Sequence, residues 1–176
     1  GAAGESWNNF HQSLGAGKTI MLNLTNAEQS SSTIWNNTAP TSSVFSVGAD
    51  AGSNGSSKTY VAYSFAEKKG YSKFGKYTGN GNADGAFVHT GFKPAWILSK
   101  RTDNSSGGEW NLLDNKRDTF NVADAKLEAN NSDAEETDVM YDILSNGFKI
   151  RAGDGNINAS GGTYIFMAFA ENPFVS

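Results

Sequence analysis

The sequence contains no cysteine, and in 176 residues it has only three prolines and two histidines. The absence of cysteine excludes disulfide bonds and thiolate metal sites, and it removes the thiol from the candidate nucleophiles. No stretch reaches the roughly 18 consecutive apolar residues that a membrane-spanning helix needs. Positive charge is scattered, and the formal net charge is −4. We therefore expect neither membrane insertion nor a nucleic-acid partner.

Glycine and aromatic residues are abundant instead. The chain contains 20 Gly together with 4 Trp, 6 Tyr and 11 Phe. Glycine, with many Asn and Ser, is typical of tight turns, and aromatic residues are enriched in strands. Helical periodicity is weak along the chain. We therefore predict an all-β protein with an antiparallel β-sandwich or jelly-roll-like architecture.

One strand-like sequence occurs twice. Residues 59–67 read TYVAYSFAE and residues 163–171 read TYIFMAFAE, and five of the nine letters agree at a fixed offset of 104 residues. The similarity continues towards the N-terminus, where GESWNNF and GGEWNLL pair Trp7 with Trp110. A duplication of this length predicts a tandem repeat with pseudo-symmetric halves.

The segment between the two copies, residues 70–106, occurs only once. If a complete unit is about 104 residues long, this segment is its first part and the duplicated sequence is its second part. We therefore predict that residues 1–69 are the C-terminal part of a first repeat unit and that residues 70–176 are a complete second unit. A single sandwich shared by both is the alternative. The start of the first unit would then be lost, lie in a longer precursor, or be replaced by pairing with another chain.

The two nonapeptides alternate bulky and small side chains, as strands do, and in the first copy the bulky face begins at Val61. Because both faces are apolar, we predict that both nonapeptides are central strands of the sandwich. PAWILSKR, residues 94–101, is predicted to be a third strand. ADAKLEA, residues 123–129, is predicted to form one or two helical turns, and residues 132–144 either a short helix or the entry to a strand.

Titratable residues form no pattern typical of an enzyme. The two histidines, His11 and His89, are far apart in the sequence and adjoin no nucleophile motif. Glu67 and Glu171 occupy equivalent strand ends and would resemble a glycosidase pair if they faced each other, but a duplicated structural carboxylate is the simpler interpretation. We predict no catalytic residue, no enzymatic activity and no cofactor.

The sequence TGNGNADG, residues 78–85, resembles the first half of a calcium-binding loop because Asn80, Asn82 and Asp84 occupy alternate positions. Such a loop needs a glutamate at its twelfth position, where this chain has Gly91. Asn and Gly also favour tight turns. We predict a hairpin turn here and no metal site.

Three tryptophans, Trp35, Trp96 and Trp110, are the candidate ligand-binding residues. An exposed indole beside polar groups is a common sugar-binding surface, because its apolar face stacks on the sugar ring. Packing in the core is the alternative for each of them. Trp35 has no tryptophan counterpart in the second copy, so it is the best single candidate for a role other than packing.

Several short segments of residues 70–174 together resemble a β-rich repeat module of marine bacteriophage virion proteins, which form tails or other appendages. The segments are YTGNG, GFKPAW, KRTD, SNGFK and YIFMAFAENPF. The second half of the module appears again over residues 4–67.

The resemblance implies a non-enzymatic structural module on the surface of a phage particle, exposed on a tail or fibre, that attaches to host-surface glycan. The alternative that it implies is a purely structural subunit that decorates a capsid or forms an appendage through β-strand edges. Other virion proteins, copies of the same chain and a host polysaccharide are then the expected partners, and the virion is the expected location.

Overall fold

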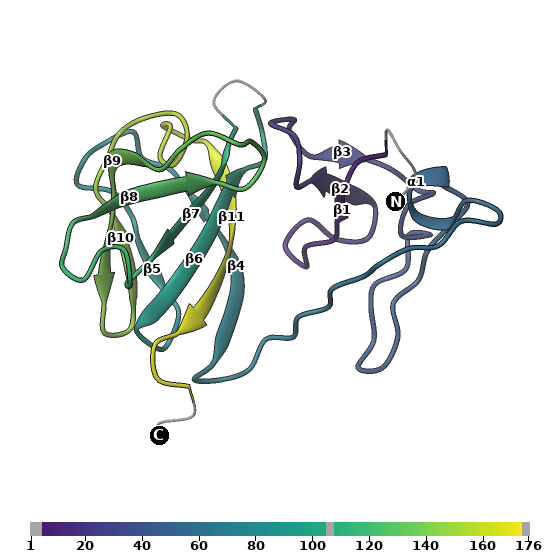
Figure 1. Cartoon of the computed structure of the whole chain (residues 1–176), viewed down its shortest axis with the longest axis horizontal. Helices are drawn as coiled ribbons and strands as arrows, with labels where there is room; N and C mark the ends of the chain where they lie inside the picture. The colour runs from purple at the N-terminus through teal and green to yellow at the C-terminus, as the bar shows by residue number, and fades with distance from the viewer. Residues whose placement is uncertain (1–4, 105–107, 174–176) are drawn as a thin grey trace.

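The computed structural model of the chain describes residues 5–104 and 108–173 (Figure 1). Every strand pair within these residues is antiparallel, and the described helix is four residues long. The predicted all-β, antiparallel fold class is therefore confirmed. None of the helical structure in the described residues is long and apolar enough to cross a membrane.

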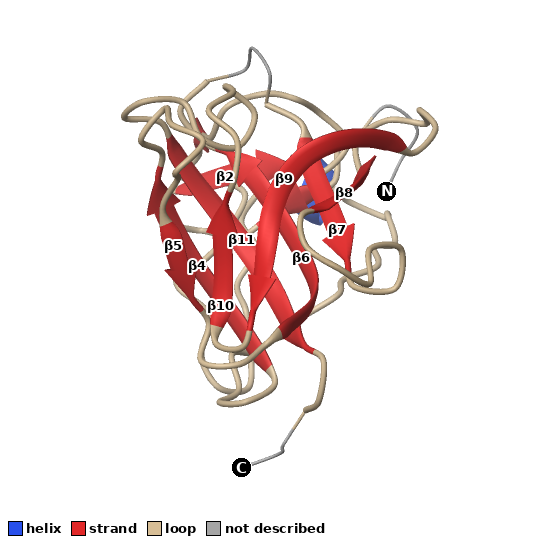
Figure 2. Ribbon diagram, turned by 90° about the vertical axis from the view of Figure 1, so that its left-hand side faces the viewer, coloured by secondary structure: helices blue, strands red, loops and turns tan. Residues whose placement is uncertain are grey.

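Residues 68–104 and 108–173 form one curled sheet, which we call the barrel (Figures 1 and 2). Its strand order is β4-β11-β6-β7-β8-β9-β10-β5, so the edges are β4 and β5. Tyr77 on β4 reaches towards the opposite end of the sheet, because its ring lies against Phe148 on β10, the neighbour of β5, and its hydroxyl donates to the carbonyl of Ile157 at 2.9 Å. The barrel is thus nearly closed. Its strands are β4 (Ser72–Thr78), β5 (Phe87–His89), β6 (Pro94–Arg101), β7 (Trp110–Asp114), β8 (Ala123–Glu128), β9 (Glu136–Leu144), β10 (Gly147–Ile150) and β11 (Thr163–Ala170).

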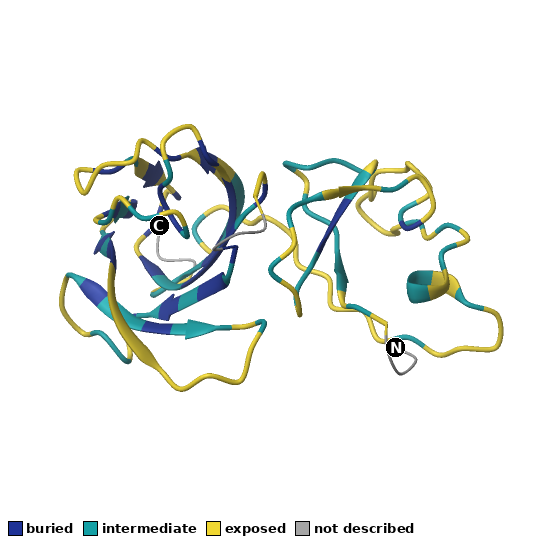
Figure 3. Ribbon diagram, turned by 90° about the horizontal axis from the view of Figure 1, so that it is seen from above, coloured by how far each residue is buried: buried dark blue, intermediate teal, exposed yellow. Residues whose placement is uncertain are grey.

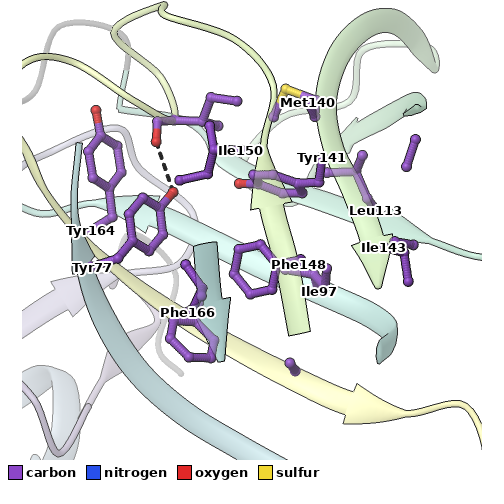
Figure 4. Packing of buried hydrophobic residues seen from close by; sticks show 14 of the residues in the cluster. Tyr77, Ile97, Leu113, Met140, Tyr141, Ile143, Phe148, Ile150, Tyr164 and Phe166 are labelled. Carbon is purple, nitrogen blue, oxygen red and sulfur yellow. Dashed lines mark hydrogen bonds between the residues drawn. The ribbon is translucent and has the colours of Figure 1, made fainter. Parts of the chain in front are cut away.

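The interior of the barrel is filled by aromatic and branched side chains (Figure 4). Tyr77 stacks on Tyr164 with ring centroids 4.8 Å apart, and the ring of Phe148 meets that of Phe166 edge to face at 5.4 Å. Gly75 on β4 lies against this cluster, and a Cβ atom there would come within 2.7 Å of the Phe166 ring. Aromatic residues therefore supply much of the apolar area of the core.

Residues 5–67, which we call the N-terminal region, contain a small three-stranded sheet of order β1-β2-β3. The short helix α1 follows this sheet, and Asp50 caps it by accepting a hydrogen bond from the amide of Gly52. Most of the remaining chain is irregular and exposed (Figure 3). The elements are β1 (Asn8–Asn9), β2 (Lys18–Met21), β3 (Gln29–Ser30) and α1 (Ala51–Asn54).

The small sheet of the N-terminal region covers part of the outer face of the barrel. Ile20 on β2 packs with Leu98, Trp110 and Ile165 in a second apolar cluster. Polar contacts accompany it, since the Trp110 indole donates to the carbonyl of Met21 at 2.8 Å. The two parts therefore share a packed interface as well as the chain that joins them.

The local sequence predicted some strands well and others poorly. Residues 94–101 form strand β6 with the predicted bounds. The helical turns predicted for residues 123–129 are wrong, because Ala123–Glu128 form strand β8 between β7 and β9. Of the two alternatives for residues 132–144, the strand entry is confirmed and the short helix is wrong, because Glu136–Leu144 form strand β9. In both segments the pairing with neighbouring strands outweighs a helical preference of a few tenths of a kcal/mol per residue.

The first nonapeptide is the main correction to the predicted fold. Residues 163–170 form the buried strand β11, paired with β4 on one side and β6 on the other. Residues 59–65, in contrast, are extended but belong to no sheet, and most of their side chains are exposed. The prediction of a central strand is wrong for residues 59–65. No segment of the described chain pairs with them as β4 and β6 pair with β11.

Candidate functional site

Trp110 is nearly buried and cannot stack on a ligand. Only 6% of its surface is exposed, its side chain packs against Ile20 and Ile165, and its indole nitrogen already donates to Met21. Its backbone is fixed as well, since the Trp110 amide donates to Asn130 Oδ1 at 2.7 Å. The structure places this candidate at the interface between the barrel and the N-terminal region.

The other two predicted tryptophans are also packed. Trp96 lies on β6, half-buried, with its ring 5.7 Å from that of Phe169. Trp35 meets Phe10 edge to face at 6.1 Å in the N-terminal region, and its indole nitrogen is buried without a hydrogen-bond partner among the described residues. Trp96 packs against the second apolar cluster, which contains Trp110, but Trp35 lies elsewhere, so the structure does not bring the three candidates together.

Trp7 and Tyr63 form the exposed aromatic pair that the sequence analysis missed. They stack with ring centroids 6.4 Å apart and an angle of 23° between the rings. Trp7 is 50% exposed and Tyr63 is 74% exposed. The duplication pairs Trp7 with Trp110, but the structure buries Trp110 and leaves Trp7 half exposed, so the sequence match alone does not separate the two environments.

The polar candidates take part in local contacts. In the loop of residues 80–84, the Asn82 amide donates to Asn80 Oδ1 and the Asp84 amide donates to Asn82 Oδ1, which is turn geometry. Within the described ranges, no three His, Asp or Glu side chains come together as a metal ion would require. Glu67 pairs with Lys73 at 2.7 Å and Glu171 with Lys93 at 3.0 Å. The Lys73 ammonium holds the pKa of Glu67 below its ordinary value, although burial opposes this effect.

Two shallow hollows indent the barrel surface. The first, of about 240 Å³, lies beside Lys93, Asp118 and Phe120, and the second, of about 290 Å³, beside Gly70 and Asn172. Neither is lined by one of the three predicted tryptophans. Both are open and lack the enclosed apolar walls of a small-molecule site.

The most unusual surface of the molecule is the segment of residues 59–65, which we call the open edge. In the part of the chain that the structure describes, its backbone forms no strand pair. Its bulky side chains Val61, Tyr63 and Phe65 are between 59% and 74% exposed. The segment has no charged residue and no proline, which are the usual protections of an exposed edge. Such a segment is suited to pair with another strand.

The small sheet beside this edge has the same register as part of the barrel. The Trp7 amide donates to Asn23 Oδ1 at 2.9 Å, as the Trp110 amide does to Asn130. Adding 103 to the residue numbers of β1 gives the equivalent positions on β7. Adding 107 to the residue numbers of β2 and β3 gives the equivalent positions on β8 and β9. The matched pairs are Asn8 with Met21 and Asn111 with Glu128, Asn9 with Ile20 and Leu112 with Leu127, Lys18 with Ser30 and Ala125 with Thr137, and Thr19 with Gln29 and Lys126 with Glu136.

A second correspondence surrounds the turn that precedes each nonapeptide. The hydroxyl of Tyr60 donates to the carbonyl of Ala51 at 2.6 Å and accepts from the amide of Gly55 at 2.7 Å. The hydroxyl of Tyr164 does the same with Gly155 and Ala159, at 2.9 and 2.8 Å. All three residues of this turn are shifted by 104 positions. The caps match too: Asp50 accepts from Gly52, as Asp154 accepts from Asn156, and Asn54 donates to Gly48, as Asn158 donates to Ala152.

Comparison with known families identifies one match. Residues 2–173 match the family described as a domain of unknown function, DUF7483. Because the match covers nearly the whole sequence, the chain belongs to this family. No match was found among the curated proteins or among the solved structures.

Proposed function

We propose that this chain is a non-enzymatic structural module of a bacteriophage particle, located on a tail or fibre, and that it joins its neighbours through β-strand edges. The open edge is the observation that supports this most strongly, because an uncharged, extended and unpaired segment is a template for strand addition. The phage assignment itself comes from the resemblance of the repeat segments to virion modules.

Two further observations favour this structural role. The shared register and turn support a tandem repeat, with residues 1–69 as the C-terminal part of one unit and residues 70–176 as a complete unit. Repeats that pack on one another are a common way to build elongated proteins. The curled sheet also supports the sandwich description, because Phe148 on β10 faces Phe166 on β11 across the core.

Labelling of particles tests the proposed role. An antibody raised against this chain should decorate the tail or fibre of phage particles produced from the genome that encodes it, when the particles are viewed by electron microscopy with gold-tagged antibody. Gold on the capsid surface would instead support capsid decoration. Particles without label, in a lysate where the protein is detected free, would refute a virion role.

Attachment to host glycan is the second candidate, and the stacked pair of Trp7 and Tyr63 favours it. Exposed aromatic rings are suited to stack on a sugar ring. If this is the function, a glycan array should show binding that Trp7→Ala and Tyr63→Ala remove. Trp110→Phe is the matched control and should leave binding unchanged, because that indole is buried. Binding that survives both alanine substitutions would exclude the pair as the sugar site.

A further inference from the structure

We infer that the N-terminal region is an opened copy of the second half of the barrel, and that its open edge is built to pair on both sides with strands of the β4 and β6 type. This inference rests on the proposed structural function, which it extends by naming the occupant. The occupant is a segment with the sequence pattern of residues 70–104, supplied by a preceding repeat in the same polypeptide.

The barrel shows what covers the equivalent strand. Strand β11 pairs with β4 from Thr163 to Phe169, and with β6 on its other side. The shift of 104 residues carries these positions onto Thr59 to Phe65, which is the open edge. Both partners of β11 come from the segment between the two copies, which occurs once in the sequence. The open edge is therefore unpaired because the sequence contains a single copy of the segment that supplies β4 and β6.

A tyrosine points to the same missing segment. The ring of Tyr164 stacks on Tyr77 of β4. Tyr60 makes the same two hydroxyl hydrogen bonds as Tyr164, but its ring has no aromatic neighbour among the described residues. The turn therefore holds the Tyr60 ring where the equivalent of Tyr77, on an added strand of the β4 type, would stack on it.

An asparagine gives an independent indication. The Asn158 side chain fastens the loop after β4, because its Oδ1 accepts from the Asn80 amide at 2.9 Å and its Nδ2 donates to the carbonyl of Asn82 at 2.7 Å. Asn54 is its equivalent and keeps the contact to Gly48, the counterpart of Ala152. In the described chain, however, Asn54 holds no second loop and lies exposed.

The three absent partners belong to one continuous piece of the barrel. Strand β4, the loop at residues 80–82 and strand β6 all lie within residues 72–101. One inserted segment of this pattern would therefore pair the open edge on both sides, stack on Tyr60 and bind Asn54. A preceding repeat is the favoured source because β7, which begins at Trp110, is the next strand after β6 in both the chain and the sheet, so a preceding repeat would lead into Trp7 in the same order. A second copy of the chain is a poorer source, because its own β4 and β6 are held in its barrel.

A fusion to the chain from Glu5 onwards tests the inference. A second copy of residues 70–107 is placed directly before Glu5, so that Trp7 follows the added segment as Trp110 follows the original. Hydrogen exchange is then measured at the amides of the open edge and of β11. We expect open-edge exchange to slow by at least about 100-fold relative to the chain alone, with the protein remaining monomeric. The same fusion with Ile97→Asp in the added copy is the matched control, because Ile97 faces the core, and it should show no protection.

Each other outcome is informative. Protection of β11 reports that the barrel has stayed folded, and if the fusion disturbs it, a peptide of residues 70–104 added to the intact chain replaces the fusion. Fast exchange at the open edge in both experiments, with β11 protected, overturns the inference. Protection in the chain alone, together with a dimer that forms as concentration rises, identifies a second copy as the occupant and overturns the preceding-repeat source. None of these results changes the gold labelling of particles, so failure of the proposed function is recognised separately.

Discussion

The N-terminal region and the barrel share a strand register and a tyrosine-centred turn, yet they differ in how much apolar surface they bury. The barrel closes around fifteen buried core residues, whereas the matching segments of the N-terminal region expose Val44, Phe45 and Tyr63. Local hydrogen bonds therefore form in both regions. Closure of the sheet occurs only where β4 and β6 are present.

The difference shows which part of a β fold is local. A turn such as that of Asp50 and Tyr60 needs only residues close in sequence, so it forms without a complete sheet. A central strand needs two neighbours, and these come from distant residues or from another segment. Matched substitutions should therefore cost more stability in the barrel than in the N-terminal region.

The largest contrast should come from a matched pair of phenylalanines. Phe148 is buried in the barrel core, and Phe45 is its counterpart where SSVFSVG, residues 42–48, aligns with SNGFKIR, residues 145–151, in the sequence duplication. Phe148→Ala should lower the free energy of unfolding by about 3–5 kcal/mol, because it removes a ring and leaves a cavity. Phe45→Ala should change it by less than about 0.5 kcal/mol, because that ring is 47% exposed.

Urea unfolding followed by tryptophan fluorescence measures both changes. Equal costs at the two positions would show that the N-terminal region has a core of its own and would contradict the comparison. In the fusion that carries a second copy of residues 70–107, the cost of Phe45→Ala should increase towards that of Phe148→Ala.

Lys100 should make the stability depend on pH between 8 and 10. Its side chain is buried where the barrel meets the N-terminal region, and its ammonium donates to the carbonyls of Thr25 and Gly108. Burial lowers its pKa from 10.5 to about 8, while the charge of Glu109 opposes this effect. The unfolded chain therefore binds more protons than the folded chain in this range. Stability from this residue should rise by about 2–3 kcal/mol as pH increases from 8 to 10.

Lys126 provides the control for this prediction. It is also buried, but its ion pairs with Glu128 and Glu136 raise its pKa although burial opposes them. Lys100→Met should remove the rise in stability between pH 8 and 10, and Lys126→Met should not. A rise of the same size in the Lys100→Met protein would show that other groups cause it.

Short-range pattern predicted much of the barrel. Residues 94–101 were predicted with their observed bounds, because a short segment with apolar side chains on both faces is typical of a buried strand. Residues 123–129 were predicted to be helical, because Ala, Lys, Leu and Glu are good helix formers. Their place between β7 and β9 depends on contacts with distant strands, which local propensity does not contain.

The candidate site was predicted less well, for a related reason. Trp110 was proposed as a ligand-binding residue, but its burial depends on Ile20, which lies about ninety residues earlier in the sequence. The open edge was predicted to be buried, because its sequence resembles that of β11. The duplication was visible from the sequence alone, whereas the missing partners appear only when the pairing of β11 is known.

The turn tyrosines should show a smaller contrast than the phenylalanines. Tyr164 is fully buried, so Tyr164→Phe leaves the partly buried amide of Ala159 without its partner and should cost about 1–2 kcal/mol, although Arg101 still donates to the carbonyl of Gly155. Tyr60→Phe removes the equivalent bonds where water can replace them, and it should cost about 0.5 kcal/mol. Thermal unfolding of both variants measures the difference. Similar losses of stability would indicate that water replaces the lost hydrogen bonds to the same extent in both turns.

His11 should give the smallest effect, a loss of stability in mild acid. Its neutral ring fits the interface, because Nδ1 accepts from the Ser13 amide and Nε2 donates to the carbonyl of Phe166 on β11, at 3.2 Å each. Burial lowers its pKa below the ordinary 6.5, although the hydrogen bond to Phe166 opposes this effect. The unfolded chain therefore gains a proton more readily, and stability should fall as pH decreases below about 6.5.

A doubly protonated ring would also turn Nδ1 into a donor that faces the Ser13 amide, so about 1 kcal/mol should be lost through this hydrogen bond. His89 provides the matched control, because it lies exposed on β5, away from this interface. His11→Gln should flatten the stability profile between pH 5 and 7, and His89→Gln should not. If the profile stays unchanged in the His11→Gln protein, the acid sensitivity arises within the barrel and not where the N-terminal region contacts β11.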